Sequence, residues 1–155
     1  MMVEPIIRIQ AEDFELEKEI KTLCADNLNI GAAVSFIGLC RDEDGTLNAL
    51  ELEHYPVMAE KQIRKIAKDA IKRFELDGLC AIHRYGKVSP GENIVLVIAA
   101  SAHRQSAFDG ANYLMDFLKT QAPFWKKEHL ANGENSKWVD AKDQDDAALD
   151  KWQDK

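Results

Sequence analysis

The feature that most constrains the fold is the apolar run "NIVLVIAAS" at residues 93–101. Its seven consecutive aliphatic residues, Ile94 to Ala100, are far fewer than the roughly 18 that a membrane-spanning helix needs. Their β-branched content predicts a strand that is covered on both faces. A turn sequence, "SPGE", precedes the run, and a helical pattern follows it. The sequence therefore predicts a sheet whose central strand leads into a helix.

The rest of the chain also alternates between strand and helix patterns. The segment 47–55 alternates in the way of a half-buried strand, and a helix with an apolar stripe begins at Pro56. We expect strands at 5–10, 31–41, 47–55, 78–88 and 93–101, and helices at 13–27, 56–74 and 106–121. This order predicts a single α+β domain over residues 1–155, with a charged tail from about residue 141 for which we expect Trp138 and Trp152 to be docking points. The strand at 31–41 is expected to be buried, and Ser106 and Asp109 have the spacing of a capping box. The apolar stripe of the last helix is expected at Ala107, Ala111, Leu114 and Leu118.

The charge and the cysteine content exclude several classes of protein. A net charge of -7 and a pI of about 5.1 do not supply the basic face that nucleic acid or anionic lipid requires. Cys24, Cys40 and Cys80 have no CxxC spacing, which favours a reduced, cytoplasmic setting. The histidines form no HxxxH or HExxH pattern, so we expect no metal site.

His103 and Arg104 stand where the central strand passes into the last helix. A helix N-terminus presents unpaired backbone N–H groups and the positive end of the helix dipole. The two side chains add charge at the same corner, which suits a phosphate or a carboxylate. The alternative is that Arg104 pairs with a surface carboxylate, and two residues by themselves favour that interpretation.

Three lysines stand in "FLKTQAPFWKKE". Lys119 lies one helical turn beyond Met115, and we expect it to be shielded from bulk water. Pro123 ends the helix, and a turn after it can return Lys126 towards Lys119. Two neighbouring ammonium groups lower each other's pKa, which prepares a lysine to act as a nucleophile or base. Ordinary solvated lysines are the alternative, and Lys127 fits that description best.

Arg41 ends the strand expected at 31–41. Gly38 permits close backbone approach, so the segment from Leu39 to Arg41 can offer N–H groups to a ligand, although a lone arginine after a strand is commonly a surface residue. Cys40 beside it is either an activated thiolate or a buried cysteine, and its apolar neighbours favour the second.

Five segments together resemble a known family. They follow one another between Gly31 and Ala141: "SFIGLCRD", "LELEHYPVMAEK", "IHRYGKVSPGE", "SAHRQSAFDGANYLMDFLKTQAPFWKKE" and "KWVDA". The most specific pattern is "HR..AF" followed by "MD.LK...PFWK.E". On these residues the chain resembles the large, catalytic subunit of molybdopterin synthase.

The resemblance implies a fold, an assembly and a reaction. The fold is an α/β-hammerhead, and the large subunit forms a homodimer that binds two small ubiquitin-like subunits, giving a heterotetramer. The tail of the small subunit ends in Gly-Gly with a thiocarboxylate and enters a pocket of the large subunit. Two sulfurs pass in succession to cyclic pyranopterin monophosphate (precursor Z), opening its cyclic phosphate and forming the dithiolene of molybdopterin. The large subunit needs no bound cofactor and no cysteine, because the sulfur comes from its partner.

The resemblance also implies roles for individual residues. Lys119 is the expected main catalytic lysine, and Lys126 is its partner in acid–base chemistry or in stabilising an oxyanion. Arg41, His103 and Arg104 are expected to bind the substrate phosphate, with Arg41 coming from the other protomer. The remaining residues expected to line the substrate site are Phe36, Leu39, Cys40, Met115, Lys127 and Glu128.

Two positions depart from the family pattern. The turn at 42–46 is short and acidic, and Gly110 stands inside a helix, where it costs about 1 kcal/mol relative to Ala and indicates close packing. Three other functions compete with sulfur transfer. They are a non-catalytic module that binds a ubiquitin-like protein, a sulfurtransferase that carries persulfide on Cys40, and a phosphohydrolase that acts without a small subunit. The intact set of cations favours the sulfurtransferase.

Overall fold

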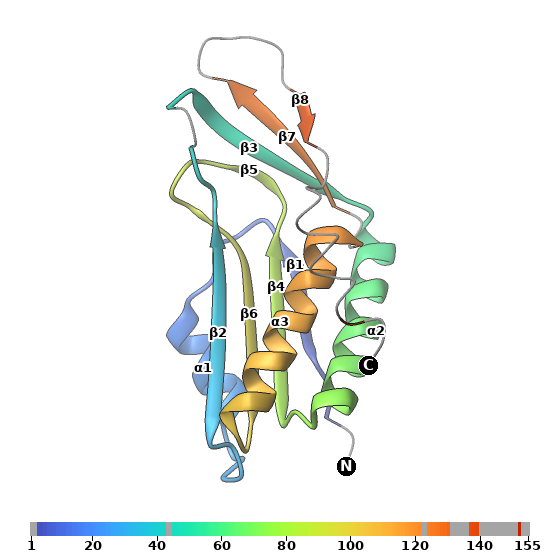
Figure 1. Ribbon diagram of the computed structural model, residues 1–155. Coiled ribbons are helices and arrows are strands. Elements are labelled where there is room, and N and C mark those ends of the chain that lie inside the picture. The colour runs from blue at the N-terminus through green and yellow to red at the C-terminus, as the bar shows by residue number, and fades with distance from the viewer. Residues whose placement is uncertain (1–2, 43–44, 122–123, 131–136, 140–151, 153–155) are drawn as a thin grey trace.

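The described part of the chain folds into two four-stranded sheets and three helices (Figure 1). The computed structural model describes residues 3–42, 45–121, 124–130, 137–139 and 152. The first sheet has the strand order β1 (Ile6–Gln10), β4 (Gly78–Arg84), β6 (Asn93–Ser101), β2 (Ala32–Leu39). The second has the order β5 (Gly86–Val88), β3 (Leu47–His54), β7 (Phe124–Leu130), β8 (Lys137–Val139). The helices are α1 (Leu16–Cys24), α2 (Pro56–Phe74) and α3 (Arg104–Thr120).

Strand β6 occupies the interior of the first sheet, as its apolar run predicts. It pairs antiparallel with β2 on one side and with β4 on the other. Every residue from Ile94 to Ser101 is buried. Because neighbouring strands satisfy its backbone groups on both edges, apolar side chains can fill both faces without leaving polar groups unpaired.

Helices cover both faces of this sheet. Side chains alternate along each strand, so neighbouring residues belong to different clusters. Ile82 and Leu96 pack on the side of α1. Leu79 and Val97 pack on the opposite side, in a larger cluster that includes side chains of α2, α3 and the second sheet. This larger cluster therefore joins the two sheets into one core.

Helix α3 packs against α2, β6 and β2. Its predicted apolar stripe is buried: Ala107, Ala111, Leu114 and Leu118. A Cβ on Gly110 would lie 2.7 Å from Leu76 Cδ1, so the predicted close packing is confirmed. The helix begins earlier than predicted, because His103 in extended conformation is its N-cap. Ser106 therefore lies within the helix, and the capping box inferred there is wrong.

Two segments in the second sheet differ from the sequence prediction. The strand expected at 78–88 is two strands in different sheets, because Gly86, with φ of 87°, redirects the chain between β4 and β5. The segment after α3, expected as a turn, is β7, which pairs with β3 as far as Phe124 opposite His54. Its aromatic residues suit a strand, and this pairing outweighs the turn signal of the preceding proline.

Strand β2 was expected to be buried, but it is only partly covered. It pairs with β6 alone and is an edge of the first sheet. Four of its residues are exposed: Ala33, Ser35, Phe36 and Leu39. Small and β-branched residues predict a strand equally well in the middle of a sheet or at an edge, so the sequence did not distinguish the two.

The C-terminal tail contributes one described contact. Trp152 packs edge-on against Phe74 and Tyr113, and the guanidinium of Arg73 lies 5.7 Å from the centre of the Trp152 ring. The prediction that Trp152 is a docking point is confirmed. The side chain of Trp138 and the other tail residues beyond 140 lie outside the described residues. Among the described helices, none is both long enough and apolar enough to cross a membrane.

Candidate active site

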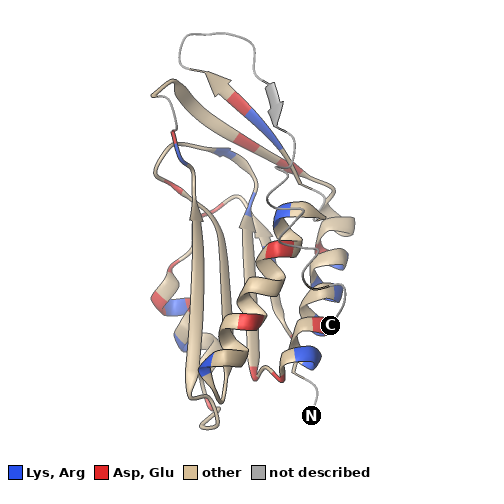
Figure 2. Ribbon diagram, viewed as in Figure 1, with Lys and Arg blue, Asp and Glu red and all other residues tan. Residues whose placement is uncertain are grey.

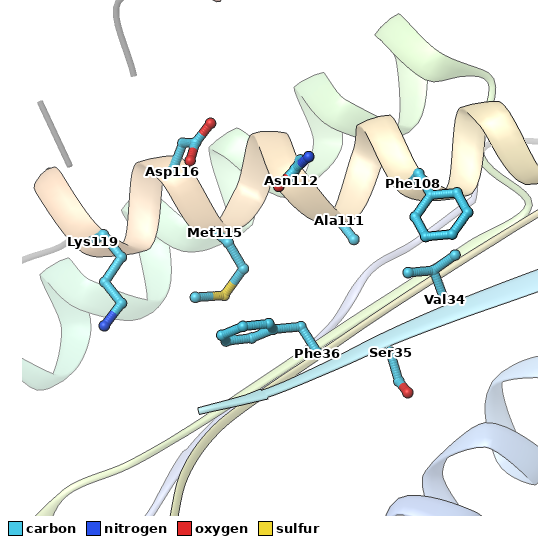
Figure 3. A pocket seen from close by; sticks show the side chains of 9 residues that line it. All are labelled: Val34, Ser35, Phe36, Phe108, Ala111, Asn112, Met115, Asp116 and Lys119. Carbon is cyan, nitrogen blue, oxygen red and sulfur yellow. The ribbon is translucent and has the colours of Figure 1, made fainter. Parts of the chain in front are cut away.

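A groove of about 360 Å³ lies between helix α3 and the edge strand β2 (Figure 3). Val34 and Phe108 face each other in one part of it, and Phe36 lies opposite Met115 in another. Lys119 extends into the groove beyond Met115, on the same helix face, as the sequence predicts. The groove therefore has apolar walls and a cation at one end, which are the usual features of a small-molecule site. Its lining residues are Val34, Ser35, Phe36, Phe108, Ala111, Asn112, Met115, Asp116 and Lys119.

The side chain of Lys119 is exposed, contrary to the expectation that it would be shielded from water. Its neighbour one turn earlier, Met115, is buried. The difference arises because Lys119 lies in the last turn of α3 and because β2, the strand facing it, is an edge strand. Among the described strands of one chain, none lies outside β2 to cover this end of the groove.

Strand register separates Lys126 from Lys127. Lys126 stands opposite the buried Leu52 of β3 and therefore belongs to the sheet face that turns towards the core. Lys127 stands opposite Glu51 on the other face. The pKa of Glu51 is lowered mainly by its hydrogen bond with His129, and the charge of Lys127 makes a smaller contribution. The two neighbouring lysines therefore have different surroundings, and Glu128 shares the face of Lys126.

A buried histidine lies where the two sheets meet. His83, near the end of β4, is 7% exposed and stacks on Phe124 with ring centres 3.8 Å apart. Burial lowers the pKa of His83 to about 4, with further lowering by the nearby charges of Lys126 and Lys119. His83 is therefore neutral at physiological pH. Both ammonium charges therefore lie near enough to His83 to act on its imidazole, whereas the meeting of Lys119 with Lys126 stays a prediction.

The segment 39–41 lies beside the turn before β6, where the N–H of Cys40 donates to the carbonyl oxygen of Glu92 at 2.9 Å. Cys40 is buried, and burial raises the pKa of its thiol, with smaller contributions from the negative charges of Glu92, Asp42 and Glu128. The buried interpretation of Cys40 is therefore confirmed, because a thiol in this setting stays protonated. Leu39 and Arg41 on either side are exposed.

His103 and Arg104 are exposed at the opposite end of α3. Fifteen residues separate Arg104 from Lys119, which at 1.5 Å per residue is roughly 22 Å along the helix axis. Figure 2 shows cations at the two ends of α3 and acidic residues between them. One chain therefore does not bring His103 and Arg104 to the lysine pair.

The described residues contain no group of three or more histidine, cysteine or acidic side chains that could hold a metal ion. What the site offers is two lysines, a neutral imidazole and apolar walls. This fold and this site define a class of protein: a two-sheet α+β protein with a paired-lysine site suited to an anionic substrate.

Comparison with known proteins identifies the family. The sequence model of the MoaE protein matches residues 9–121, and the chain belongs to this family. It is 59% identical over 152 residues to the molybdopterin synthase catalytic subunit of Rhizobium meliloti, covering 97% of this chain and 98% of that protein. A solved structure, the molybdopterin biosynthesis MoaE protein from Burkholderia ambifaria, has a TM-score of 0.82 at 45% identity, covering 96% of this chain and 97% of that one.

A second solved structure is a complex. It holds subunits 1 and 2 of the molybdopterin-converting factor from Helicobacter pylori, and one of its chains matches with a TM-score of 0.70 at 25% identity, covering 93% of this chain and 92% of that one. The α/β-hammerhead, single-domain fold predicted from the resemblance is confirmed by these structural matches.

Sequence reasoning missed His83 as a site residue. Apart from His103, the histidines were considered only as metal ligands, and none has suitable spacing. The available signal was position: His83 stands in "GLCAIHR", where every other residue before the arginine is apolar or glycine. A titratable side chain in a wholly buried strand is uncommon and marks a place worth testing for function.

Proposed function

We propose that this chain is the catalytic subunit of a molybdopterin synthase. It transfers sulfur from the C-terminal thiocarboxylate of a small ubiquitin-like subunit to cyclic pyranopterin monophosphate, yielding molybdopterin. The observation that carries the proposal is the apolar groove with the Lys119 cation at one end, together with Lys126 on the core-facing side of β7. The family supports the reaction, and the site supplies residues that suit it.

The two lysines match the charges of both reactants. The thiocarboxylate and the phosphate ester are anionic, so two ammonium groups lower the cost of bringing them together. As the thiocarboxylate sulfur bonds to the pterin carbon, a carbon–oxygen bond to the phosphate breaks, and a lysine can give a proton to the departing oxygen. Water then cleaves the acyl carbon–sulfur bond of the resulting thioester, which leaves the sulfur on the pterin and a carboxylate on the small subunit. Lys119 in the groove is the main catalytic group, and Lys126 is its partner. Phe36 and Met115 supply apolar walls for the pterin ring.

A second copy of the chain completes the anion site. A two-fold interface is self-complementary, so pairing the α3–β2 faces in opposite directions sets Arg104 of one copy near Lys119 of the other. His103 and Arg104 then bind the phosphate from the partner's side. Strand β2 and helix α3 run in the same direction, so Arg41 lies towards the Lys119 end of its own chain. We therefore infer that Arg41 acts in its own protomer, in place of the crossed arrangement expected from sequence.

An apolar surface near Lys126 suits the small subunit. Tyr55 and Trp125 meet edge-to-face at 4.7 Å, and Val57 and Met58 follow in the first turn of α2. All four are at least 42% exposed. Trp125 immediately precedes Lys126 but lies on the opposite face of β7, so we expect a small protein bound here to reach the lysines with its extended tail. We therefore propose that a small subunit binds this exposed apolar surface. The proposal also includes an assembly with two copies of each subunit and a cytoplasmic location.

Reconstitution tests the reaction. The purified chain is mixed with a thiocarboxylated small subunit and cyclic pyranopterin monophosphate, and the dithiolene product is assayed. Product from the wild type supports the proposal. Tight binding without product would instead indicate a non-catalytic module, and turnover without the small subunit would indicate a phosphohydrolase. Loss of activity in Cys40→Ser would indicate a persulfide carrier.

Mixed dimers test the composite site. Lys119→Ala and Arg104→Ala chains are each weak, but a dimer of one with the other contains one intact site and one doubly defective site. Random assortment makes half of the dimers mixed, so about a quarter of the sites regain full activity. No recovery on mixing would show that each chain carries a complete site.

A further inference from the structure

The hydrogen bond of His83 fixes its tautomer. Its Nδ1 lies 2.8 Å from the backbone carbonyl oxygen of Arg84. A carbonyl oxygen only accepts hydrogen bonds, so Nδ1 carries the proton and donates it. Because the imidazole is neutral, Nε2 on the opposite edge of the ring retains its lone pair. His83 therefore presents a hydrogen-bond acceptor at this edge.

The orientation of the ring is fixed from two directions. The bond to the Arg84 carbonyl holds one edge, and Phe124 covers one face at an interplanar angle of 16°. Phe124 also contacts the ring of His54, so it is held between two histidines. Rotating His83 would break either the hydrogen bond or the stack. Its lone pair is thus set in place before any ligand binds, which is how a supporting residue orients a functional one.

The charges of two lysines from other elements act on this imidazole. Lys126 comes from β7 and Lys119 from α3, and the charge of Lys126 has the larger influence on His83. His54 from β3 is the third titratable neighbour, and burial lowers its pKa as well. Phe124 connects His83 with the face of β7 that carries Lys126, because it stacks on His83 and lies two residues before Lys126 on that face.

We propose that His83 is a positioning residue for the catalytic lysines, whose Nε2 lone pair accepts a hydrogen bond from the Lys126 ammonium group and holds it beside Lys119. His83 does not contact the substrate in this role. The consequence for turnover rests on the proposed function, whereas the hydrogen bond is a property of this chain alone. The two parts are therefore tested separately.

Nitrogen-15 NMR of labelled histidine tests the hydrogen bond without any turnover. The Nε2 resonance of His83, assigned by its loss in His83→Gln, shifts when a donor is removed. We expect Lys126→Met to move it and the matched variant Lys127→Met, on the opposite face of β7, to leave it in place. An unmoved resonance in Lys126→Met would overturn the proposal, whatever the activity of the enzyme.

Kinetics of the reconstituted enzyme test the consequence. His83→Phe keeps the stacking surface but removes the acceptor, and we expect it to lower kcat about tenfold or more, the effect of losing one hydrogen bond to a charged group. KM for the pterin substrate and Kd for the small subunit stay near wild-type values. His83→Gln, whose amide oxygen reaches the Nε2 position, regains part of the rate. His129→Phe is the matched control, since His129 pairs with Glu51 on the outer face of β7.

Thermal melting of each variant separates a loss of folding from a loss of positioning. A wild-type kcat in folded His83→Phe would refute the positioning role. A lowered kcat that Gln does not improve would show that His83 acts only through packing. Absence of product from the wild-type enzyme would overturn the proposed function instead, and the NMR result would still decide the hydrogen bond.

Discussion

The two sheets of this protein differ in how their side chains are used. In the first sheet, β4 is buried over its whole length and β6 from Ile94 onwards, and they hold the molecule together. In the second, β3 and β7 are partly covered, β3 carries its glutamates on one face, and β7 carries charged residues on both faces. The first sheet supplies His83 and supports α3, and the second brings Lys126 to meet them. The candidate catalytic residues therefore lie at the junction of a buried sheet and a more exposed one.

This difference teaches which substitutions damage the fold and which damage the site. A side chain packed on all sides contributes mainly to stability, whereas a half-covered charged side chain contributes little to stability and is available for function. Substitutions in the first sheet should lower the free energy of unfolding. Substitutions of the lysines at the junction should lower turnover in a protein that stays folded.

The largest effect is expected at Lys119. Lys119→Ala removes the cation in the groove, and we expect turnover to fall roughly a hundredfold to a thousandfold, as when a group that stabilises developing charge is lost. The melting temperature should stay within a few degrees of wild type, because the side chain is exposed. Retention of most activity in this variant would remove Lys119 from the mechanism.

The next effect concerns stability. Ile98 in β6 is completely buried, and Ile98→Ala should cost about 2–5 kcal/mol in the free energy of unfolding. Val57→Ala, at a position that is 76% exposed, is the control and should change it by less than about 0.5 kcal/mol. Denaturant titration measures both. Equal losses in the two variants would contradict the link between burial and stability on which the comparison of the sheets rests.

The two adjacent lysines sharpen the comparison within a single strand. Lys126→Ala should reduce turnover roughly tenfold to a hundredfold, because it removes one of the two cations at the site. Lys127→Ala changes the opposite face of β7 and should leave turnover within about twofold of wild type. Similar losses in both variants would mean that register does not determine which lysine acts.

The smallest effect tests an ion pair in the first sheet. Arg8 of β1 bonds Glu19 of α1, and this bond lowers the pKa of the Glu19 carboxyl below its ordinary value of 4.5. A lowered folded-state pKa contributes stability that is present above 4.5 and is lost as the pH falls through the folded value. Glu19→Gln should therefore cost about 1 kcal/mol at pH 7. Unfolding experiments at pH 7 and pH 3 should show that the difference from wild type shrinks in acid.

Much of the fold was predictable from local patterns. The run Ile94 to Ala100 predicts a covered strand, and the apolar stripe of α3 predicts its buried face. Both are confirmed, because burial of these residues is the main source of stability and leaves a regular spacing in the sequence. The edge position of β2 and the division between β4 and β5 were not predictable in this way. They depend on which strands pair, and strand order produces no regular spacing of residue types along the sequence.

In the candidate site, too, some features were predictable from the sequence and others depended on the tertiary structure. The sequence by itself determined the residue types, the α+β class and the resemblance that names the reaction, and it placed Lys119 and Met115 on one helix face because helical period is a local property. Only the tertiary structure decided that Lys126 faces the core while Lys127 does not, since that depends on the register of β7 against β3. It alone placed His83 where the charges of both lysines act on its imidazole. Contacts of this kind depend on how sheets and helices pack, and no spacing along the chain encodes them.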